Sequence, residues 1–228
     1  MTALDLSVIT HNLNYLLVKG LGLTIELTMI CAAAGLVLGG VLAVLRLYGP
    51  AWLRLSVAAY VNLVRSIPLL LVIFWFYFLV PYVIAWVTRA PNPVQLNAFV
   101  SAMVTFTLFE ACYYCEILRA GLQSISTGQK FAAQALGLSQ IDVMRCVLLP
   151  QALKSVTPIL MLQIIVLFQD ISLVYVVSLT DFVGAATQLA QQQNRLVEVY
   201  LFVALVYFVI CFSATKGIRH LQLRLANQ

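Results

Sequence analysis

Residues 21–45 read LGLTIELTMICAAAGLVLGGVLAVL, a stretch with a single charge, on Glu26, and no proline. About 20 apolar residues in a helix span the hydrocarbon core of a bilayer, so this stretch is long enough to cross one. Gly35 and Gly39 are spaced as G-x-x-x-G within it, which allows a second helix to approach closely. The stretch therefore predicts a membrane helix that packs against a neighbour.

The composition of the whole chain agrees with a membrane location. Of 228 residues, 63% are apolar and only 9% are charged, whereas soluble domains carry about 25% charged residues. This composition excludes a soluble enzyme, a disordered tail and a nucleic-acid-binding protein, and the net charge of +5 is spread thinly along the chain. Together with Leu21–Leu45, four more segments predict an all-α integral membrane protein with five spans: Val57–Val83, Leu96–Leu118, Val156–Leu179 and Val199–Ala214.

Basic residues between the predicted spans indicate the orientation. Lys19, Arg89 and Arg195 would lie on the side of the N-terminus. Nine basic residues would lie on the other side: Arg46, Arg54, Arg119, Lys130, Arg145, Lys154, Lys216, Arg219 and Arg224. Loops rich in Lys and Arg stay in the cytoplasm. The C-terminus is thus expected inside and the N-terminus outside. Residues 1–18 have no basic leading region, which argues against a signal peptide. Residues 1–19 are expected to form an N-terminal segment on the outer, periplasmic side.

Cysteine and histidine usage argues against a metal site or a catalytic centre. The chain has five cysteines, an odd number, and most of them lie in apolar stretches, so no disulfide framework is indicated. Cys112 and Cys115 form a C-x-x-C inside a hydrophobic segment and are interpreted as packed side chains. The two histidines, His11 and His220, lie near opposite ends. We expect no catalytic residues, no metal ligands and no enzyme activity in this chain.

Three charged residues lie near the middle of three different spans, namely Arg65, Glu110 and Asp170. Ionisable groups at this depth are costly and usually face a protein interior or a wet path. Pro68 should break the helix beside Arg65, as helices that line a cavity often are. We expect a substrate pathway lined by Arg65, Ser66, Gln169, Asp170, Ser172 and Glu110.

Within that pathway Arg65 offers a planar fork suited to a carboxylate, and Asp170 is suited to a substrate ammonium group. The alternative is a structural ion pair of Arg65 with Asp170 or Glu110, and a structural role is favoured for Glu110. Glu116 and Arg119, three residues apart, are most simply an intrahelical pair.

The loop of about 35 residues between spans three and four is the most informative polar segment. Apolar and small residues recur at helical spacing up to Leu136, and Gly137 can end that helix in a left-handed conformation. Ser139 followed by Asp142 predicts the start of a second helix, which Pro150 would break or kink. Two short helices with an apolar face would fit a groove on another protein. The alternative is an amphipathic loop that lies on lipid headgroups.

This loop resembles the coupling loop of permeases in ABC importers. Ala132 and Ala133, then Gly137, then Val147-Leu148-Leu149-Pro150 match its alanines, glycine, leucine and proline at the same spacing, although Phe131 stands where the family has Glu. The resemblance covers nearly the whole chain. Three further stretches are similar to the polar amino-acid permeases, namely Tyr60–Pro68, Tyr114–Gly121 and Phe168–Val174. The stretch Phe168–Val174 is similar to the glutamate/aspartate branch of that family.

The resemblance implies a type-1 importer permease fold, with a transmembrane domain over 20–216, a coupling loop at about 120–150 and a cytoplasmic tail over 217–228. It implies a multi-pass subunit of the bacterial inner membrane that imports glutamate and aspartate. Its implied partners are an ATPase dimer that binds ATP and Mg, a second homologous permease and a periplasmic binding protein. The residues implied to dock the ATPase are Gly128, Phe131, Ala132, Ala133, Leu136 and Gly137.

The chain itself has no G-x-x-x-x-G-K-[ST] phosphate loop, so ATP hydrolysis is expected in the partner. Two other functions stay open from the residues. One is a permease for another polar amino acid, such as glutamine, histidine or arginine, and the other is an ion-coupled carrier that needs no ATP. The polar segment 185–198 either contacts a binding protein or is an ordinary solvated loop.

Overall fold

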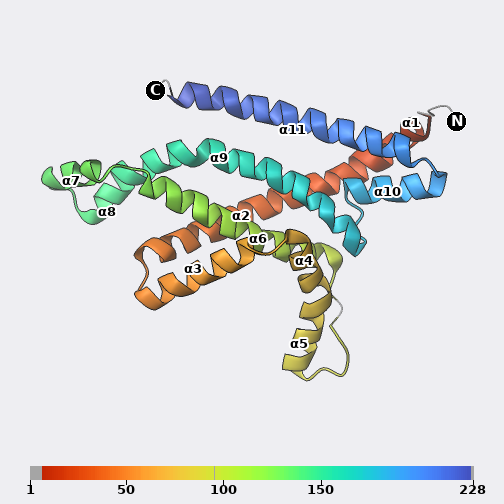
Figure 1. Cartoon of the computed structure of the whole chain (residues 1–228), viewed down its shortest axis with the longest axis horizontal. Coiled ribbons are helices and arrows are strands. Elements are labelled where there is room, and N and C mark those ends of the chain that lie inside the picture. Colours follow the sequence, from red (N-terminus) through yellow and green to blue (C-terminus); the bar gives the residue numbers. More distant parts are fainter. Residues whose placement is uncertain (1–6, 95, 227–228) are drawn as a thin grey trace. The chain divides into compact units, whose positions relative to one another are not determined.

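The computed structural model describes residues 7–94 and 96–226, and within them every regular element is helical. Figure 1 labels the α-helices, which are α1 (Ser7–Leu13), α2 (Gly22–Tyr48), α3 (Ala51–Arg65), α4 (Leu69–Phe74), α5 (Val80–Thr88), α6 (Ala98–Gln123), α7 (Thr127–Ala135), α8 (Gln140–Asp142), α9 (Leu149–Asp170), α10 (Phe182–Gln193) and α11 (Leu196–Ala226). Wider π-helical turns join some of them, namely η1 (Asn14–Leu21), η2 (Trp75–Leu79) and η3 (Val143–Leu148), and a 3₁₀ segment, η4 (Ile171–Val177), follows α9.

Five helices of the described part are long and apolar enough to cross a membrane, which confirms the predicted number. Their bounds are Ser7–Tyr48, Leu69–Thr88, Ala98–Gln123, Gln140–Val177 and Leu196–Arg224. The first helix begins at Ser7 rather than near Leu21, so part of the predicted N-terminal segment is helical. Residues 1–6 of that segment lie outside the described residues. The last helix runs into the predicted cytoplasmic tail.

The second predicted span, Val57–Val83, is not one helix. It is interrupted between Arg65, where α3 ends, and Leu69, where α4 begins. Pro68 lacks a backbone N–H and disfavours helical geometry at the residue before it, so the expected break occurs here. The apolar helix that remains long enough to span is Leu69–Thr88, and Trp75 and Phe78 of its aromatic run are exposed on its surface.

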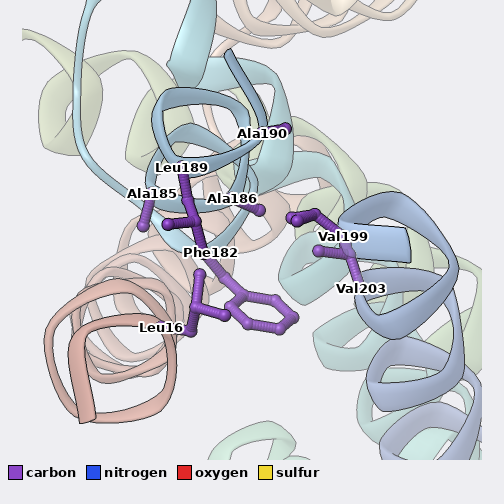
Figure 2. Packing of buried hydrophobic residues seen from close by; sticks show 8 residues of the cluster. All are labelled: Leu16, Phe182, Ala185, Ala186, Leu189, Ala190, Val199 and Val203. Carbon is purple, nitrogen blue, oxygen red and sulfur yellow. The ribbon is translucent and has the colours of Figure 1, made fainter. Parts of the chain in front are cut away.

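The chain forms two compact units, each built from three separate segments. The first comprises the described part of Met1–Ala33 with Ile67–Thr107 and Ile164–Thr215. Its core joins η1, α10 and α11, and Figure 2 shows the ring of Phe182 among the small and branched side chains of that core. The buried cluster consists of Leu16, Phe182, Ala185, Ala186, Leu189, Ala190, Val199 and Val203.

Segment 185–198, expected to be a polar loop, is instead mostly the helix α10. Its buried alanines lie on one face, and its glutamines near the C-terminal end are exposed. Asp181 is fully buried and caps the helix, since its carboxylate accepts hydrogen bonds from the backbone N–H groups of Val183 (3.1 Å) and Gly184 (2.9 Å). The Thr24 hydroxyl oxygen accepts a further hydrogen bond, 3.0 Å long, from the backbone N–H of Phe182. These contacts satisfy donors that a helix N-terminus leaves free.

The second unit comprises Ala34–Ser66, Leu108–Gln163 and the described part of Lys216–Gln228. Its core joins α2, α3 and α6 through Ala43, Val57, Val61, Cys112 and Cys115. Both cysteines are buried free thiols, as the interpretation of the C-x-x-C motif expected.

The predicted close approach at the G-x-x-x-G motif is present in this second unit. A Cβ atom added at Gly39 would lie 2.7 Å from the Cβ of Tyr114 and 2.8 Å from the backbone oxygen of Ala111. One added at Gly35 would lie 3.0 Å from the Cβ of Glu110. The two glycines therefore let α2 lie directly against the backbone of α6.

The two predicted helix boundaries are present in the coupling loop, but the predicted break at Pro150 is not. Helix α7 ends before Gly137, which has a φ of 82° as a left-handed cap requires, and the Ser139 hydroxyl accepts a hydrogen bond from the N–H of Asp142 (3.2 Å). The second helix does not stop at Pro150. It continues through the wide turns of η3 into α9, so Pro150 lies inside a continuous helix, directly after those turns.

Candidate functional site

A cavity of about 520 Å³ opens in the second unit between the end of α3, the second half of α6 and the first half of α9. We call it the Arg65 cavity. On α6 its wall follows helical spacing, so that residues three or four apart share one face, and the same holds for α9. The lining residues are Arg65, Tyr113, Glu116, Ile117, Ala120, Gly121, Ser124, Ser155, Val156, Ile159 and Gln163.

Arg65 is placed by the break at Pro68, because it is the last residue of α3 and its side chain is exposed there. Its guanidinium carbon lies 5.1 Å from the centre of the Tyr113 ring, a distance typical of cation–π contact. Among the described residues of the second unit, no carboxylate lies within 4.0 Å of the Arg65 guanidinium. The alternative of an ion pair with Glu110 is therefore not formed within this unit, and the alternative of a pair with Asp170, which belongs to the first unit, stays a prediction.

Glu110 is buried, with 1% of its surface exposed, and it is connected to the cavity through Gln163. The side-chain amide of Gln163 donates to both carboxylate oxygens of Glu110, at 3.2 Å each. A buried charge needs such partners, and the contact orients an amide that lines the cavity. This geometry agrees with the structural role favoured for Glu110.

Glu116 also lines the Arg65 cavity. It pairs with Arg119 on its own helix, as predicted, and also with Arg46 of α2, whose Nη1 lies 2.5 Å from the carboxylate. One carboxylate therefore binds two guanidinium groups. Arg46 was expected simply as a loop residue, and its contact across to α6 was not foreseen.

The remaining predicted pathway residues are placed separately. Ser66 directly follows α3, and its hydroxyl donates to the backbone oxygen of Asn62 at 2.7 Å. Gln169 and Asp170 end α9, and Ser172 lies in the 3₁₀ segment that follows, all three in the first unit. Asp170 is partly buried. The structure thus joins Arg65 and Glu110 to one cavity, while Gln169, Asp170 and Ser172 belong to the other compact unit.

Tyr113 and Gln163 line the Arg65 cavity but were not predicted as site residues. Tyr113 lies three residues after Glu110 and four before Ile117, so the helical spacing of charged and polar residues on α6 contained the signal. Gln163 is an isolated polar residue in an apolar stretch of α9, which is a second usable signal.

The predicted docking residues gather on and just after α7. Phe131 and Leu136 are exposed apolar side chains, and Gly128, Ala132 and Gly137 are also exposed. Ala133 is buried, so its side chain supports the packing of α7 rather than presenting a surface. Ile141 is a further exposed apolar residue of this segment, which sequence reasoning missed. We call the exposed residues Phe131, Ala132, Leu136 and Ile141 the coupling knob.

The described part of the chain contains no candidate metal site. No group of three or more His, Cys, Asp or Glu side chains is arranged there to hold a metal ion. The chemistry that the Arg65 cavity supports is the binding of a polar, anionic molecule, with apolar walls and few polar groups, as in most ligand pockets.

Comparison with known proteins identifies the family of the chain. The family model described as "Binding-protein-dependent transport system inner membrane component" matches residues 35–227. The chain is 45% identical to the glutamate/aspartate import permease protein GltK of Escherichia coli O6:H1 over 226 residues, which cover 99% of this chain and all of the relative. It is 34% identical to the probable glutamine ABC transporter permease protein GlnM of Bacillus subtilis, with 89% of each chain covered.

A solved structure has the same fold. The chain matches a crystal structure of an amino acid ABC transporter with histidines, with a TM-score of 0.87 and 26% identity. The match covers 98% of this chain and all of the other. The expected all-α importer permease fold with five membrane helices is thereby confirmed.

Proposed function

Because the chain belongs to the family of binding-protein-dependent transport system inner membrane components and is an amino-acid permease of the ABC importer type, we propose that it imports acidic amino acids, glutamate and aspartate, by ATP-driven alternating access. The 45% identity to GltK, whose name gives those two substrates, supports this choice of substrate. Permeases of other polar amino acids share less of the sequence among the relatives compared above.

The observation that carries the proposal is the guanidinium of Arg65. It is exposed to a cavity of about 520 Å³, within the usual range for small-molecule sites, and Tyr113 rather than a carboxylate contacts it. An arginine in a membrane protein that no carboxylate contacts directly is costly, so a negatively charged ligand would relieve that cost. We propose that Arg65 binds a carboxylate of the substrate.

The other predicted pathway residues receive roles on the same basis. Gln163, fixed by Glu110, is proposed to hydrogen-bond a second polar group of the substrate. Ser66, Gln169 and Ser172 supply neutral donors and acceptors along the path, and Asp170 is proposed to bind the substrate ammonium group.

The energy for transport is proposed to come from a separate ATPase dimer, which binds ATP and Mg and receives the coupling knob in a groove. The exposed apolar side chains of Phe131 and Leu136 suit such a groove. A second, homologous permease subunit would complete the pathway, and a periplasmic binding protein would deliver the substrate. The N-terminus is proposed to face the periplasm and the C-terminus the cytoplasm.

Uptake by the purified complex tests this proposal. The tagged chain would be purified from its own membranes together with its bound subunits, which mass spectrometry identifies, and reconstituted in liposomes with ATP inside or outside. We expect accumulation of labelled glutamate and aspartate that needs ATP on the ATPase side, and little accumulation of glutamine, histidine or arginine. Preferential uptake of one of these three would refute the acidic substrate, and accumulation without any ATPase would refute the coupling.

A further inference from the structure

A second cavity of about 390 Å³ lies in the second unit, at the corner where α2 ends and α3 begins. We call it the corner cavity. Arg46 and Arg54 line it together with Ala51, Leu55 and Ala58. None of the roles proposed above uses this cavity, and Gly49 and Pro50 form the turn beside it.

The corner cavity carries a surplus of positive charge. Arg46 and Arg119 share the single carboxylate of Glu116. Arg54 is exposed, and among the described residues no carboxylate lies within 4.0 Å of it. Three guanidinium groups against one carboxylate leave two positive charges unmatched. No side chain caps the first backbone N–H groups of α3. These groups add to the positive electrostatic potential that the arginines supply.

An apolar stripe begins beside this charge and follows α3 away from the corner. Trp52 is 68% exposed, Leu55 72% and Leu63 61%, and the intervening Ala59 is also exposed. Their spacing of three and four residues places them on one face of the helix. At 1.5 Å per residue the stripe from Trp52 to Leu63 is about 16 Å long. Half of the hydrocarbon core of a bilayer is about 15 Å thick.

Aromatic side chains mark the end of the stripe near the arginines. Trp52 and Tyr48 are both largely exposed beside the turn, and Trp and Tyr are enriched at the boundary between lipid and water. A cationic pocket at headgroup depth, continued by an apolar face one leaflet long, has the charge and shape of a phospholipid rather than of a free anion.

We propose that the corner cavity binds the headgroup of an anionic phospholipid, with Arg46 and Arg54 on the phosphate and an acyl chain along the stripe from Trp52 to Leu63. The distribution of basic residues assigns this corner to the cytoplasmic leaflet. Arg54 supplies the free charge, while Arg46 is held in place by Glu116. This lipid would fix the start of α3, the helix whose other end carries Arg65.

Lipid titration of the intact complex tests the proposal. The complex is delipidated in detergent, titrated with dioleoyl phosphatidylglycerol and analysed by native mass spectrometry. Arg54→Gln is compared with Lys154→Gln, which removes the same charge from an exposed residue outside the corner cavity. We expect Arg54→Gln to weaken the tightest binding event by at least about tenfold, as loss of a charge-assisted contact implies, and Lys154→Gln to leave it within about twofold.

Two further measurements separate the lipid from other anions. Leu63→Ser leaves the corner cavity intact and should weaken the long-chain lipid several-fold while leaving dihexanoyl phosphatidylglycerol unchanged. Inorganic phosphate should not displace the long-chain lipid at equal concentration. Equal binding by the Arg54→Gln and Lys154→Gln complexes, or displacement by phosphate alone, would overturn the proposal. Because Arg54 makes no packing contact in the core, circular dichroism should show unchanged helix content in its variant. The outcome is independent of which amino acid the complex transports.

Discussion

The guanidinium carbon of Arg65, the last residue of α3, lies 5.1 Å from the centre of the Tyr113 ring of α6. The ring face attracts the cation and fixes its direction, but it offers no acceptor for the N–H groups of the guanidinium. The hydrogen-bonding capacity of Arg65 therefore stays available for a ligand in the cavity. This arrangement supports the proposal that Arg65 binds a ligand.

Tyr113 should matter through its ring and not through its hydroxyl. Replacing it with Phe keeps the ring face, whereas Leu removes the cation–π contact, which is worth about 0.5–2 kcal/mol. We expect Tyr113→Phe to transport with nearly unchanged apparent affinity and Tyr113→Leu to lose about 2- to 30-fold. Concentration dependence of glutamate uptake measures both. Equal affinities of the two variants would show that the ring does not position Arg65.

Two adjacent glycines of α2 provide a matched test of helix packing. A Cβ at Gly39 would lie 2.7 Å from Tyr114 and 2.8 Å from the backbone of Ala111, whereas one at Gly40 meets nothing closer than 3.9 Å. Gly39→Ala should destabilise the protein by about 1–3 kcal/mol through overpacking. Gly40→Ala should be neutral or stabilise it by up to about 1 kcal/mol, because alanine favours the helix. Thermal unfolding in detergent compares them, and similar shifts in the two variants would contradict the close approach of α2 and α6.

Asp181 should make the stability of α10 depend on pH. Burial raises the pKa of its carboxyl from 3.8 to about 6, although the hydrogen bonds from Val183 and Gly184 act in the opposite direction. The folded state therefore holds a proton that the unfolded state releases between about pH 4 and pH 6. Stability falls as pH rises through this window, by up to about 3 kcal/mol.

Replacement of Asp181 by Asn, a neutral capping residue, tests whether stability falls with rising pH as predicted. Asp181→Asn can still accept the capping hydrogen bonds but cannot ionise. Hydrogen exchange of the α10 amides, corrected for intrinsic rates, is measured at about pH 4.5 and about pH 6.5, which bracket most of the transition. Protection of the wild type should fall between these two pH values, whereas protection of the variant should stay constant. A wild-type profile as flat as that of the variant would mean that Asp181 stays ionised throughout.

The coupling knob should transmit the action of the ATPase. Ala132 is exposed on α7 beside Phe131, so a charged side chain there would be placed against a partner without disturbing the core. We expect Ala132→Glu to lower uptake at least about tenfold while ATP hydrolysis by the complex continues or the ATPase dissociates. Ala132→Ser, a small polar control, should behave like the wild type. Normal coupling in Ala132→Glu would exclude this face as the docking surface.

Much of the fold could be predicted because the signals are local. Apolar length gave five spans, Pro68 gave the break after Arg65, and Gly137 and Ser139 gave the boundaries within the coupling loop. The helix that begins at Ser7 was missed because polar residues such as His11 and Asn12 interrupt the apolar pattern. Their side chains hydrogen-bond to carbonyls one turn earlier, so the helix continues despite its polarity.

The candidate site was harder to predict because it depends on contacts between distant segments. Sequence spacing placed Arg65 and Glu110 at similar depth. It offered weak signals for Tyr113 and Gln163 but did not show that these residues link Arg65 and Glu110 to one cavity. The ion pair of Arg46 with Glu116 joins residues 70 positions apart and leaves no local pattern. Pro150 alone predicts that the helix breaks or kinks, whereas the helix continues past it, directly after the wide turns of η3.

The most direct test of the account is glutamate uptake by the reconstituted complex with Arg65→Ala and Arg65→Lys. Loss of hydrogen bonds to a charged group costs about 1.5–3 kcal/mol. We therefore expect Arg65→Ala to lower uptake at subsaturating glutamate by about 10- to 100-fold and Arg65→Lys to retain an intermediate level, with the subunits still assembled in both. Wild-type uptake by a correctly assembled Arg65→Ala complex would contradict the account.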